Sequence, residues 1–323
     1  MSLDLIMASK RIAYIDAAKT ICIFFMVVGH WTSNDVLIRY IYSFHMPALF
    51  IISGYLYKPR PWYKTILSLG IPVAFYSLLN LCFLVATNEI SVISLFSKEL
   101  FFRLFHYRYG LGQGLYMGDW FIWALLALRF IFGDIQIMKV FRRNYFYLFI
   151  LAILYMSFES YLIEVDALVH GWYWGRALPS LPFFCFGLYL KDKGWYPEKM
   201  SIGVISVLFL IFMLLPIING YCSINENQFG LSYVVFLLNA IGSTLFLFFV
   251  SNRIKSTKAI IVFSKGTLLI LGLHMPIMMI LDMIFPPFFH ELLPLLVLPI
   301  CYFPILLLDR CCPELLGKIR WNI

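Results

Sequence analysis

Residues 11 to 57 read RIAYIDAAKTICIFFMVVGHWTSNDVLIRYIYSFHMPALFIISGYLY. Two apolar runs, 13–32 and 37–57, lie on either side of a short polar turn. Each run has about 20 residues, which is the length that an α-helix needs to cross the hydrocarbon core of a bilayer. This stretch therefore predicts two adjacent transmembrane helices.

The rest of the chain repeats this pattern. Of the 323 residues, 62% are hydrophobic and 13% are charged, with a mean hydropathy of +0.86, whereas soluble domains carry roughly 25% charged residues. This composition excludes a soluble, disordered or fibrous protein. We predict an all-α polytopic integral membrane protein with about ten transmembrane helices, in a single domain that spans residues 1–323 with no additional soluble domain. The predicted spans are 13–32, 37–57, 65–86, 117–133, 145–165, 176–190, 201–219, 229–250, 259–281 and 288–308.

The positive charges indicate which side of the membrane each loop faces. The net charge of +8 could suggest nucleic acid, but a nucleic-acid-binding stripe needs a polar surface, so no nucleic-acid partner is expected. With the N-terminus inside, five of the 25 Lys and Arg residues lie in outer loops, Lys19 lies within the first span, and the other nineteen lie on the inner side. The five outer residues are Arg39, Lys98, Arg103, Arg108 and Arg176. Because excess Lys and Arg mark the cytoplasmic side, both termini are predicted to be cytoplasmic.

Ionisable side chains inside a span indicate candidate functional sites, because burying them in the bilayer is costly. The first span holds Asp16, Lys19 and His30. At 100° per residue these three lie on one helix face, with Lys19 and His30 about 16 Å apart along the axis. Ordinary interpretations remain open, since Lys19 could snorkel to the inner interface beside Asp16 and His30 could be hydrated at the outer interface.

The second span carries another histidine at a similar depth. His45 enters the membrane from the side on which His30 ends, so the two imidazoles are expected to share a site. Pro47 removes one backbone hydrogen bond from the helix, and Gly54 permits another helix to approach closely.

These two spans resemble the start of the acyltransferase-3 family of integral membrane O-acyltransferases, and in particular its fucose 4-O-acetylase-like branch. The family pattern is a basic residue, ten residues and a histidine, which Lys19 and His30 match, followed by Phe-Phe-x-x-Ser-Gly, which residues 49–54 match except at Leu49. Further similar segments are residues 119–125, 181–187 and 266–276.

The resemblance implies a ten-helix membrane domain that transfers an acyl group, usually acetyl, from cytoplasmic acyl-CoA to a hydroxyl of a carbohydrate or glycan. Acetyl-CoA is then the donor substrate, and no bound cofactor is expected. The implied partners are acyl-CoA, a glycan acceptor and membrane lipid, and the implied location is the bacterial cytoplasmic (inner) membrane. Nothing in the resemblance specifies the oligomeric state.

Acyl transfer from a thioester to an alcohol needs a base for the hydroxyl proton and donors for the developing oxyanion. We expect His30 to act as the general base, with His45 orienting it or contacting substrate. Lys19 and Asp16 are expected on the acyl-CoA side of the site. The unranked candidates for oxyanion or acceptor contacts are Ser53, Trp120, Arg176 and His274.

Several alternatives remain open from the sequence. Three imidazoles can hold zinc, but the spacing of His30, His45 and His274 lacks a compact ligand motif, so no metal is predicted. His274 could also serve only in helix packing. The competing function is a transporter or flippase for a polar or glycan substrate, although we find no paired half-chain repeats. A membrane sensor or scaffold would not need the Lys19–His30 stripe.

Overall fold

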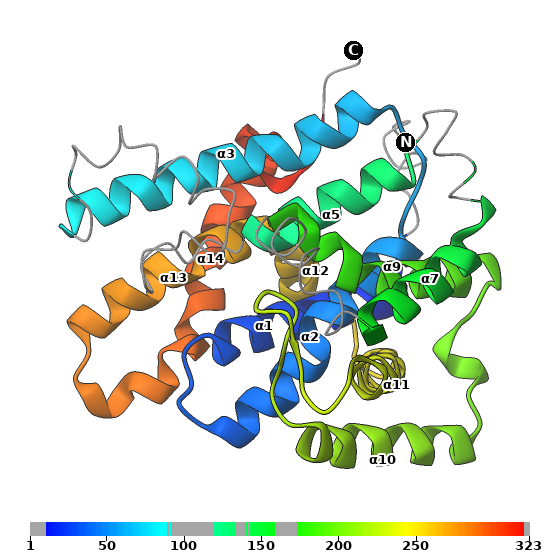
Figure 1. Ribbon diagram of the computed structural model, residues 1–323. Coiled ribbons are helices and arrows are strands. Elements are labelled where there is room, and N and C mark those ends of the chain that lie inside the picture. Colours follow the sequence, from blue (N-terminus) through cyan, green and yellow to red (C-terminus); the bar gives the residue numbers. More distant parts are fainter. Residues whose placement is uncertain are drawn as a thin grey trace.

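The computed structural model describes residues 11–88, 91, 119–133, 140, 143–158 and 173–319, and this part of the chain is mostly helical, as predicted (Figure 1). The α-helices are α1 (Ala13–Gly29), α2 (Asp35–Tyr55), α3 (Trp62–Ala86), α5 (Asp119–Ile131), α7 (Tyr145–Phe158), α9 (Ala177–Asp192), α10 (Ile202–Asn219), α11 (Tyr233–Ser251), α12 (Lys258–Lys265), α13 (Thr267–Ile284) and α14 (Pro294–Cys311). The shorter elements are the 3₁₀ helices η5 (Tyr173–Arg176), η6 (Pro197–Lys199), η7 (Pro287–Leu292) and η8 (Pro313–Leu316), and the strands β1 (Cys222–Ser223) and β2 (Gln228–Phe229).

Several helices begin at a polar side chain that caps their first turn. The side chains of Asn34, Ser201, Ser232 and Thr257 each accept a hydrogen bond from the backbone N–H three residues later. Such caps satisfy N–H groups that have no partner within the helix. The starts of α2, α10, α11 and α12 are therefore explained by the local sequence.

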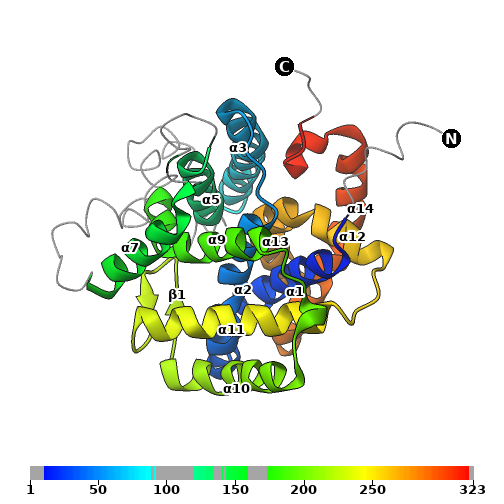
Figure 2. The ribbon, with the colours of Figure 1, turned by 90° about the vertical axis from the view of Figure 1, so that its right-hand side faces the viewer.

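Helices α1 and α2 lie at the centre of the bundle. Helix α2 packs against α9, α1 and α11, and α1 packs against α2, α12, α11 and α13. Figures 1 and 2 show α3 on one side of this pair and α10 on the opposite side. The two spans that carry the candidate residues of the N-terminal stretch are therefore enclosed by other helices.

Helices α2 and α9 cross at two glycines. A Cβ atom placed on Gly54 would lie 2.1 Å from the carbonyl oxygen of Phe184, and one placed on Gly187 would lie 2.1 Å from that of Ile51. The neighbours are backbone atoms, which cannot turn aside as a flexible side chain can. The expectation that Gly54 permits a close helix approach is confirmed.

Six of the described helices are long and apolar enough to cross a membrane: α2, α3, α10, α11, α13 and α14. Helices α5 and α7 are shorter apolar helices. Only 17% of the apolar window of α10 is buried, and Ile202, Val207 and Ile217 are among its exposed side chains. So large an apolar surface suits contact with lipid rather than water. The count of ten spans and the cytoplasmic termini stay predictions.

The structure corrects some details of the predicted spans. The ninth range, 259–281, is broken at Gly266 between α12 and α13, where a Cβ atom would lie 2.1 Å from Ile305 Cδ1. The tenth range begins in η7, and the α14 helix starts at Pro294. The strands β1 and β2 form a short antiparallel hairpin between α10 and α11, which the all-α prediction did not include. The part of the fifth range after residue 158 lies outside the described residues.

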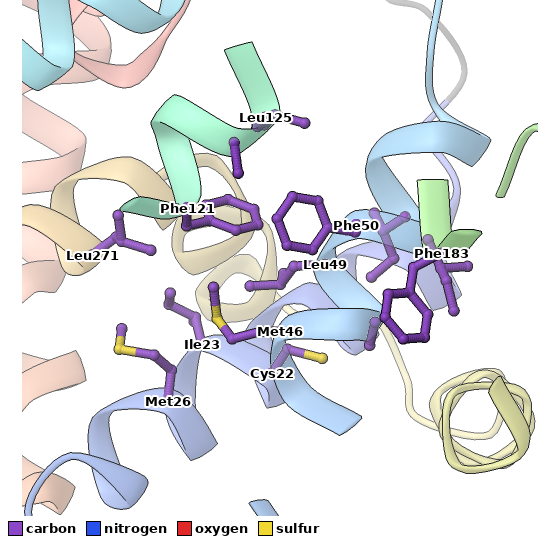
Figure 3. Close-up of a cluster of buried hydrophobic side chains, with 14 of the residues drawn as sticks. Cys22, Ile23, Met26, Met46, Leu49, Phe50, Phe121, Leu125, Phe183 and Leu271 are labelled. Carbon is purple, nitrogen blue, oxygen red and sulfur yellow. The ribbon is translucent and has the colours of Figure 1, made fainter. Parts of the chain in front are cut away.

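An apolar layer fills the middle of the bundle. Figure 3 shows Ile23 and Met26 of α1 beside Met46 of α2, Phe121 of α5 and Leu271 of α13. Ile23 and Met26 are at most 2% exposed. Because these two residues separate Lys19 from His30 along α1, the predicted polar stripe is interrupted by dry packing. Polar side chains therefore form two separate groups, one at each end of α1.

Candidate functional site

The first group surrounds His30, which follows the last residue of α1 and caps it. The hydroxyl of Tyr42 on α2 lies 3.3 Å from His30 Nδ1, and the two rings contact edge to face. Gly29 makes this contact possible, because a Cβ atom there would lie 2.8 Å from Ile41 and 3.1 Å from the Tyr42 ring. The short turn between α1 and α2 thus places a phenol against the imidazole.

The second imidazole of this group comes from the far end of the chain. The His274 ring of α13 lies 5.2 Å from the His30 ring, centroid to centroid. Pro276 has no N–H and so leaves the carbonyl of Gly272 without its helical partner. The side-chain amide of Asn80 on α3 donates to this carbonyl at 2.8 Å. The proline in α13 is therefore accommodated, and His274 is held by a helix that is tied to α3.

His45 joins the same group through Tyr42. The Tyr42 ring lies 5.2 Å from the His45 ring and 6.0 Å from the His30 ring, centroid to centroid. The expected sharing of a site by His30 and His45 is therefore indirect, with Tyr42 between them. The side chain that contacts His30 from α2 is Tyr42, which the sequence argument did not single out.

Both His-Met-Pro triplets orient their histidine in the same way. His45 Nδ1 lies 2.6 Å from the carbonyl oxygen of Ile41, and His274 Nδ1 lies 2.9 Å from that of Leu271 and 3.2 Å from that of Ile270. A carbonyl oxygen can only accept, so Nδ1 donates the proton in each case. In the neutral ring Nε2 then carries the lone pair and acts as a hydrogen-bond acceptor or base.

The β1–β2 hairpin covers this group from the α10–α11 side. Its neighbour Tyr221 lies 5.6 Å from Tyr42 between ring centroids, and the Tyr221 hydroxyl donates to the carboxylate of Glu226 at 3.2 Å. The hairpin is held by Asn219, whose amide donates to the carbonyl of Phe229 and to the sulfur of Cys222. Tyr221 and Glu226 were not predicted, because their sequence separation from the histidines gives no signal of this contact.

The second polar group lies at the other end of α1. The guanidinium of Arg11 donates to both carboxylate oxygens of Asp16, at 2.9 and 2.7 Å, and the Ser264 hydroxyl donates to the same carboxylate at 2.5 Å. Lys19 donates to the backbone carbonyl of Ser264 at 2.7 Å. The carboxylate of Asp16 therefore accepts hydrogen bonds from Arg11 and Ser264. Lys19, which the sequence suggested could pair with Asp16, instead donates to the backbone of Ser264. The place of Asp16 and Lys19 on the acyl-CoA side of the site stays a prediction.

The other predicted contacts come from α2, α5 and η5. Ser53 donates to the Leu49 carbonyl within α2, about 12 Å along the axis from His45. Trp120 packs against Phe50 and Phe121 in the apolar layer. Arg176 is 2% exposed in η5, which packs against α5 and α9. Of the four candidates, His274 is the one in ring contact with His30.

Metal ligation finds no support in the described part of the chain. No group of three or more His, Cys, Asp or Glu side chains there could hold a metal ion. The group around His30 contains three imidazoles, two phenols and one carboxylate: His30, His45, His274, Tyr42, Tyr221 and Glu226. Such groups accept, donate and transfer protons.

A helical membrane protein with buried imidazoles at one end of its central helices and a basic group at the other has the parts of a membrane-embedded transferase. Comparison with known families agrees, since the model of the acyltransferase-3 family, described as an acyltransferase domain, matches residues 12–308. The chain belongs to this family and is an acyltransferase of the membrane. No curated protein and no solved structure that was compared with the chain matches it.

Proposed function

We propose that this acyltransferase moves an acetyl group from cytoplasmic acetyl-CoA to a hydroxyl of a carbohydrate or glycan. The single observation that supports this best is the contact between His30 and His274 inside a chain of the acyltransferase-3 family. An imidazole has an ordinary pKa near neutrality and can take a proton from a hydroxyl as that hydroxyl attacks a carbonyl. The same imidazole would have no such task in a transporter or a scaffold.

The reaction follows in two steps around His30. The acceptor oxygen attacks the thioester carbonyl while an imidazole nitrogen of His30 takes the hydroxyl proton, which gives a tetrahedral oxyanion. The carbon–sulfur bond then breaks, the carbonyl re-forms, and CoA leaves as a thiolate that the imidazolium of His30 protonates. The base is thereby regenerated, and no net proton is gained or lost.

Tyr42 and His45 support His30 in this proposal. The phenol of Tyr42 is 3.3 Å from Nδ1 and orients the ring. The ring of His45 contacts the same tyrosine edge to face. Ser53, Trp120 and Arg176 remain candidate contacts of the acyl donor or acceptor at other depths.

The donor side is assigned to the Lys19 end of α1. Lys19 and Arg11 supply positive charge there, and CoA carries phosphates that such charges attract. Lys19 and His30 are about 16 Å apart along the helix axis, which suits the extended arm between the phosphates and the thioester of CoA. This arm would have to pass the apolar layer around Ile23 and Met26.

The proposal also covers the number of spans and the orientation of the chain in the membrane. We assign ten transmembrane helices in one domain that spans residues 1–323, with both termini in the cytoplasm and the histidine group near the outer face. The excess of Lys and Arg on the inner side supports this orientation. We further propose the fucose 4-O-acetylase-like branch and the bacterial inner membrane, on the resemblance of residues 11–57.

The test is transfer of a radiolabelled acetyl group from acetyl-CoA to surface glycans by the purified protein. Replacing His30→Gln is expected to lower the rate by about 10²–10⁴. The matched control is His290→Gln, because His290 lies in η7 with an exposed side chain. Equal transfer by the His30 variant and the wild type would reject His30 as the base, and glycan export that persists without acetyl transfer would favour a transporter. Mass spectrometry of glycans from cells with and without the gene identifies the acceptor by its lost acetyl increment.

A further inference from the structure

The Nε2 atom of His274 has no hydrogen-bond partner among the described residues. The residue is 2% exposed. A buried polar atom without a partner costs about 1–3 kcal/mol, so such atoms are rare unless a ligand satisfies them. The other nitrogen, Nδ1, is fully occupied by the carbonyls of Leu271 and Ile270.

This occupation decides what Nε2 can bind. Because Nδ1 donates its proton to carbonyl oxygens, Nε2 of neutral His274 is an acceptor with no hydrogen to give. It cannot donate a hydrogen bond to an oxyanion, so of the oxyanion and acceptor contacts expected for His274 the geometry favours the contact with the acceptor. It can bind an O–H or N–H of a ligand, and the nearest polar ring to it is His30, 5.2 Å away between centroids.

We infer that His274 Nε2 binds a second hydroxyl of the acceptor, adjacent to the hydroxyl that His30 deprotonates. Two neighbouring imidazoles that both accept hydrogen bonds match a ligand with two neighbouring hydroxyl donors. The acceptor class is therefore a vicinal diol on a ring, as carbohydrates offer. This inference rests on the proposed acetyl transfer and narrows its acceptor.

The test uses small probes that differ by one hydroxyl. Purified wild-type protein receives acetyl-CoA with cis-1,2-cyclohexanediol, with cyclohexanol, or with water alone. Loss of one hydrogen bond in a buried site is expected to make kcat/KM for cyclohexanol at least about tenfold lower than for the diol. Hydrolysis of acetyl-CoA in water alone uses the same proposed base, and its rate is subtracted as the background.

Two variants of His274 test whether its side chain binds the second hydroxyl of the diol or only supports activity in general. His274→Phe keeps a ring of similar size without an acceptor and is expected to lower kcat/KM for the diol toward the value for cyclohexanol, so that the preference for the diol is abolished. His274→Gln, which can return an acceptor atom near the position of Nε2, is expected to restore part of the preference. Thermal unfolding of each variant in detergent checks that the helices remain packed.

The outcomes distinguish the two proposals. Equal use of diol and alcohol by the wild type overturns the role of His274, as does a His274→Phe variant that loses activity with all acceptors in the same proportion. The wild-type comparison decides even if both variants fail to fold. Absence of any His30-dependent cleavage of acetyl-CoA would instead overturn the proposed function and, with it, this inference.

Discussion

The imidazole of His30 at the end of α1 lies 5.2 Å from that of His274 in α13, although the two residues come from opposite ends of the chain. Their partners differ, since His274 is fixed by backbone carbonyls while His30 faces the hydroxyl of Tyr42. The Tyr42 hydroxyl can either donate to Nδ1 of His30 or accept from it, so the imidazole proton of His30 can lie on either nitrogen. This difference suits His30 to proton transfer and His274 to binding.

Replacing Tyr42→Phe is expected to lower kcat by about three- to tenfold, the cost of one neutral hydrogen bond. The reason is that the hydroxyl 3.3 Å from His30 Nδ1 orients the ring, whereas the aromatic contacts of Tyr42 remain in phenylalanine. Steady-state kinetics with acetyl-CoA would show this as a loss in kcat with little change in KM for the donor.

The matched control for Tyr42 is Tyr40→Phe on the same helix. The Tyr40 hydroxyl donates to the carbonyl of Met213 at 2.6 Å, which is also one hydrogen bond, directed at α10. Equal effects of the two substitutions on kcat would show that Tyr42 contributes only to helix packing.

Replacing Gly54→Ala is expected to destabilise the protein by about 1–3 kcal/mol or more, because a Cβ atom would meet the Phe184 carbonyl at 2.1 Å. Gly187→Ala should do the same from the other side of the crossing. Gly203→Ala in α10 is the control, since nothing lies within 4 Å of its Cβ position and alanine favours a helix by about 1 kcal/mol. Thermal unfolding in detergent measures all three, and an unchanged midpoint for Gly54→Ala would contradict the close crossing.

Much of this fold could be predicted from the sequence because each helix signal is local. Long apolar runs and their polar boundaries predicted the described α-helices, although α12 and α13 were expected as one span. Ser201 and Ser232 cap the helices α10 and α11, as serine does at many helix starts. The break at Gly266 escaped prediction, because the apolar run continues on both sides of it and the close approach of Ile305 to this glycine is a contact between distant parts of the chain. The hairpin at residues 222–229 is too short to produce a periodic pattern.

The candidate site was predicted in part for the same reason. His30 and His45 could be placed at one depth by helix geometry, and the repeated His-Met-Pro triplet indicated His274. The rotation of one helix against another cannot be read from periodicity, so the sequence did not show that His274, rather than His45, contacts His30. The intervening position of Tyr42 likewise depends on Gly29 and the turn that follows it.

Acidification is expected to release a contact between the α1–α2 turn and η7. The hydroxyl and backbone N–H of Ser33 donate to one carboxylate oxygen of Glu291 at 2.5 and 2.9 Å, and these bonds lower the pKa of Glu291 below its ordinary value of 4.5. A carboxyl whose pKa is lower in the folded chain stabilises the fold above the unfolded pKa, and this stabilisation is lost as pH falls through the folded value. The effect is small because Glu291 is exposed to solvent.

Thermal unfolding as a function of pH measures this contact. The difference in midpoint between wild type and Glu291→Gln is expected to be constant at neutral pH and to shrink below about pH 4.5. Ser33→Ala removes the hydroxyl donor and should weaken the same dependence. A difference that is independent of pH down to acid conditions would show that the Ser33–Glu291 contact does not form.

Replacing Lys19→Met is expected to raise KM for acetyl-CoA by about tenfold, because it removes a charge assigned to the CoA phosphates. The effect on kcat should be smaller, since Lys19 is about 16 Å from His30 along α1. Lys19→Arg retains the charge and should recover most of the affinity, while Lys199→Met, an exposed residue of η6, controls for loss of a lysine elsewhere. S-acetylpantetheine sharpens the test because it lacks the CoA nucleotide and its phosphates, so wild type and Lys19→Met should use this donor equally well. A variant that uses both donors as well as the wild type would show that Lys19 serves only to hold Ser264 and the inner end of α1.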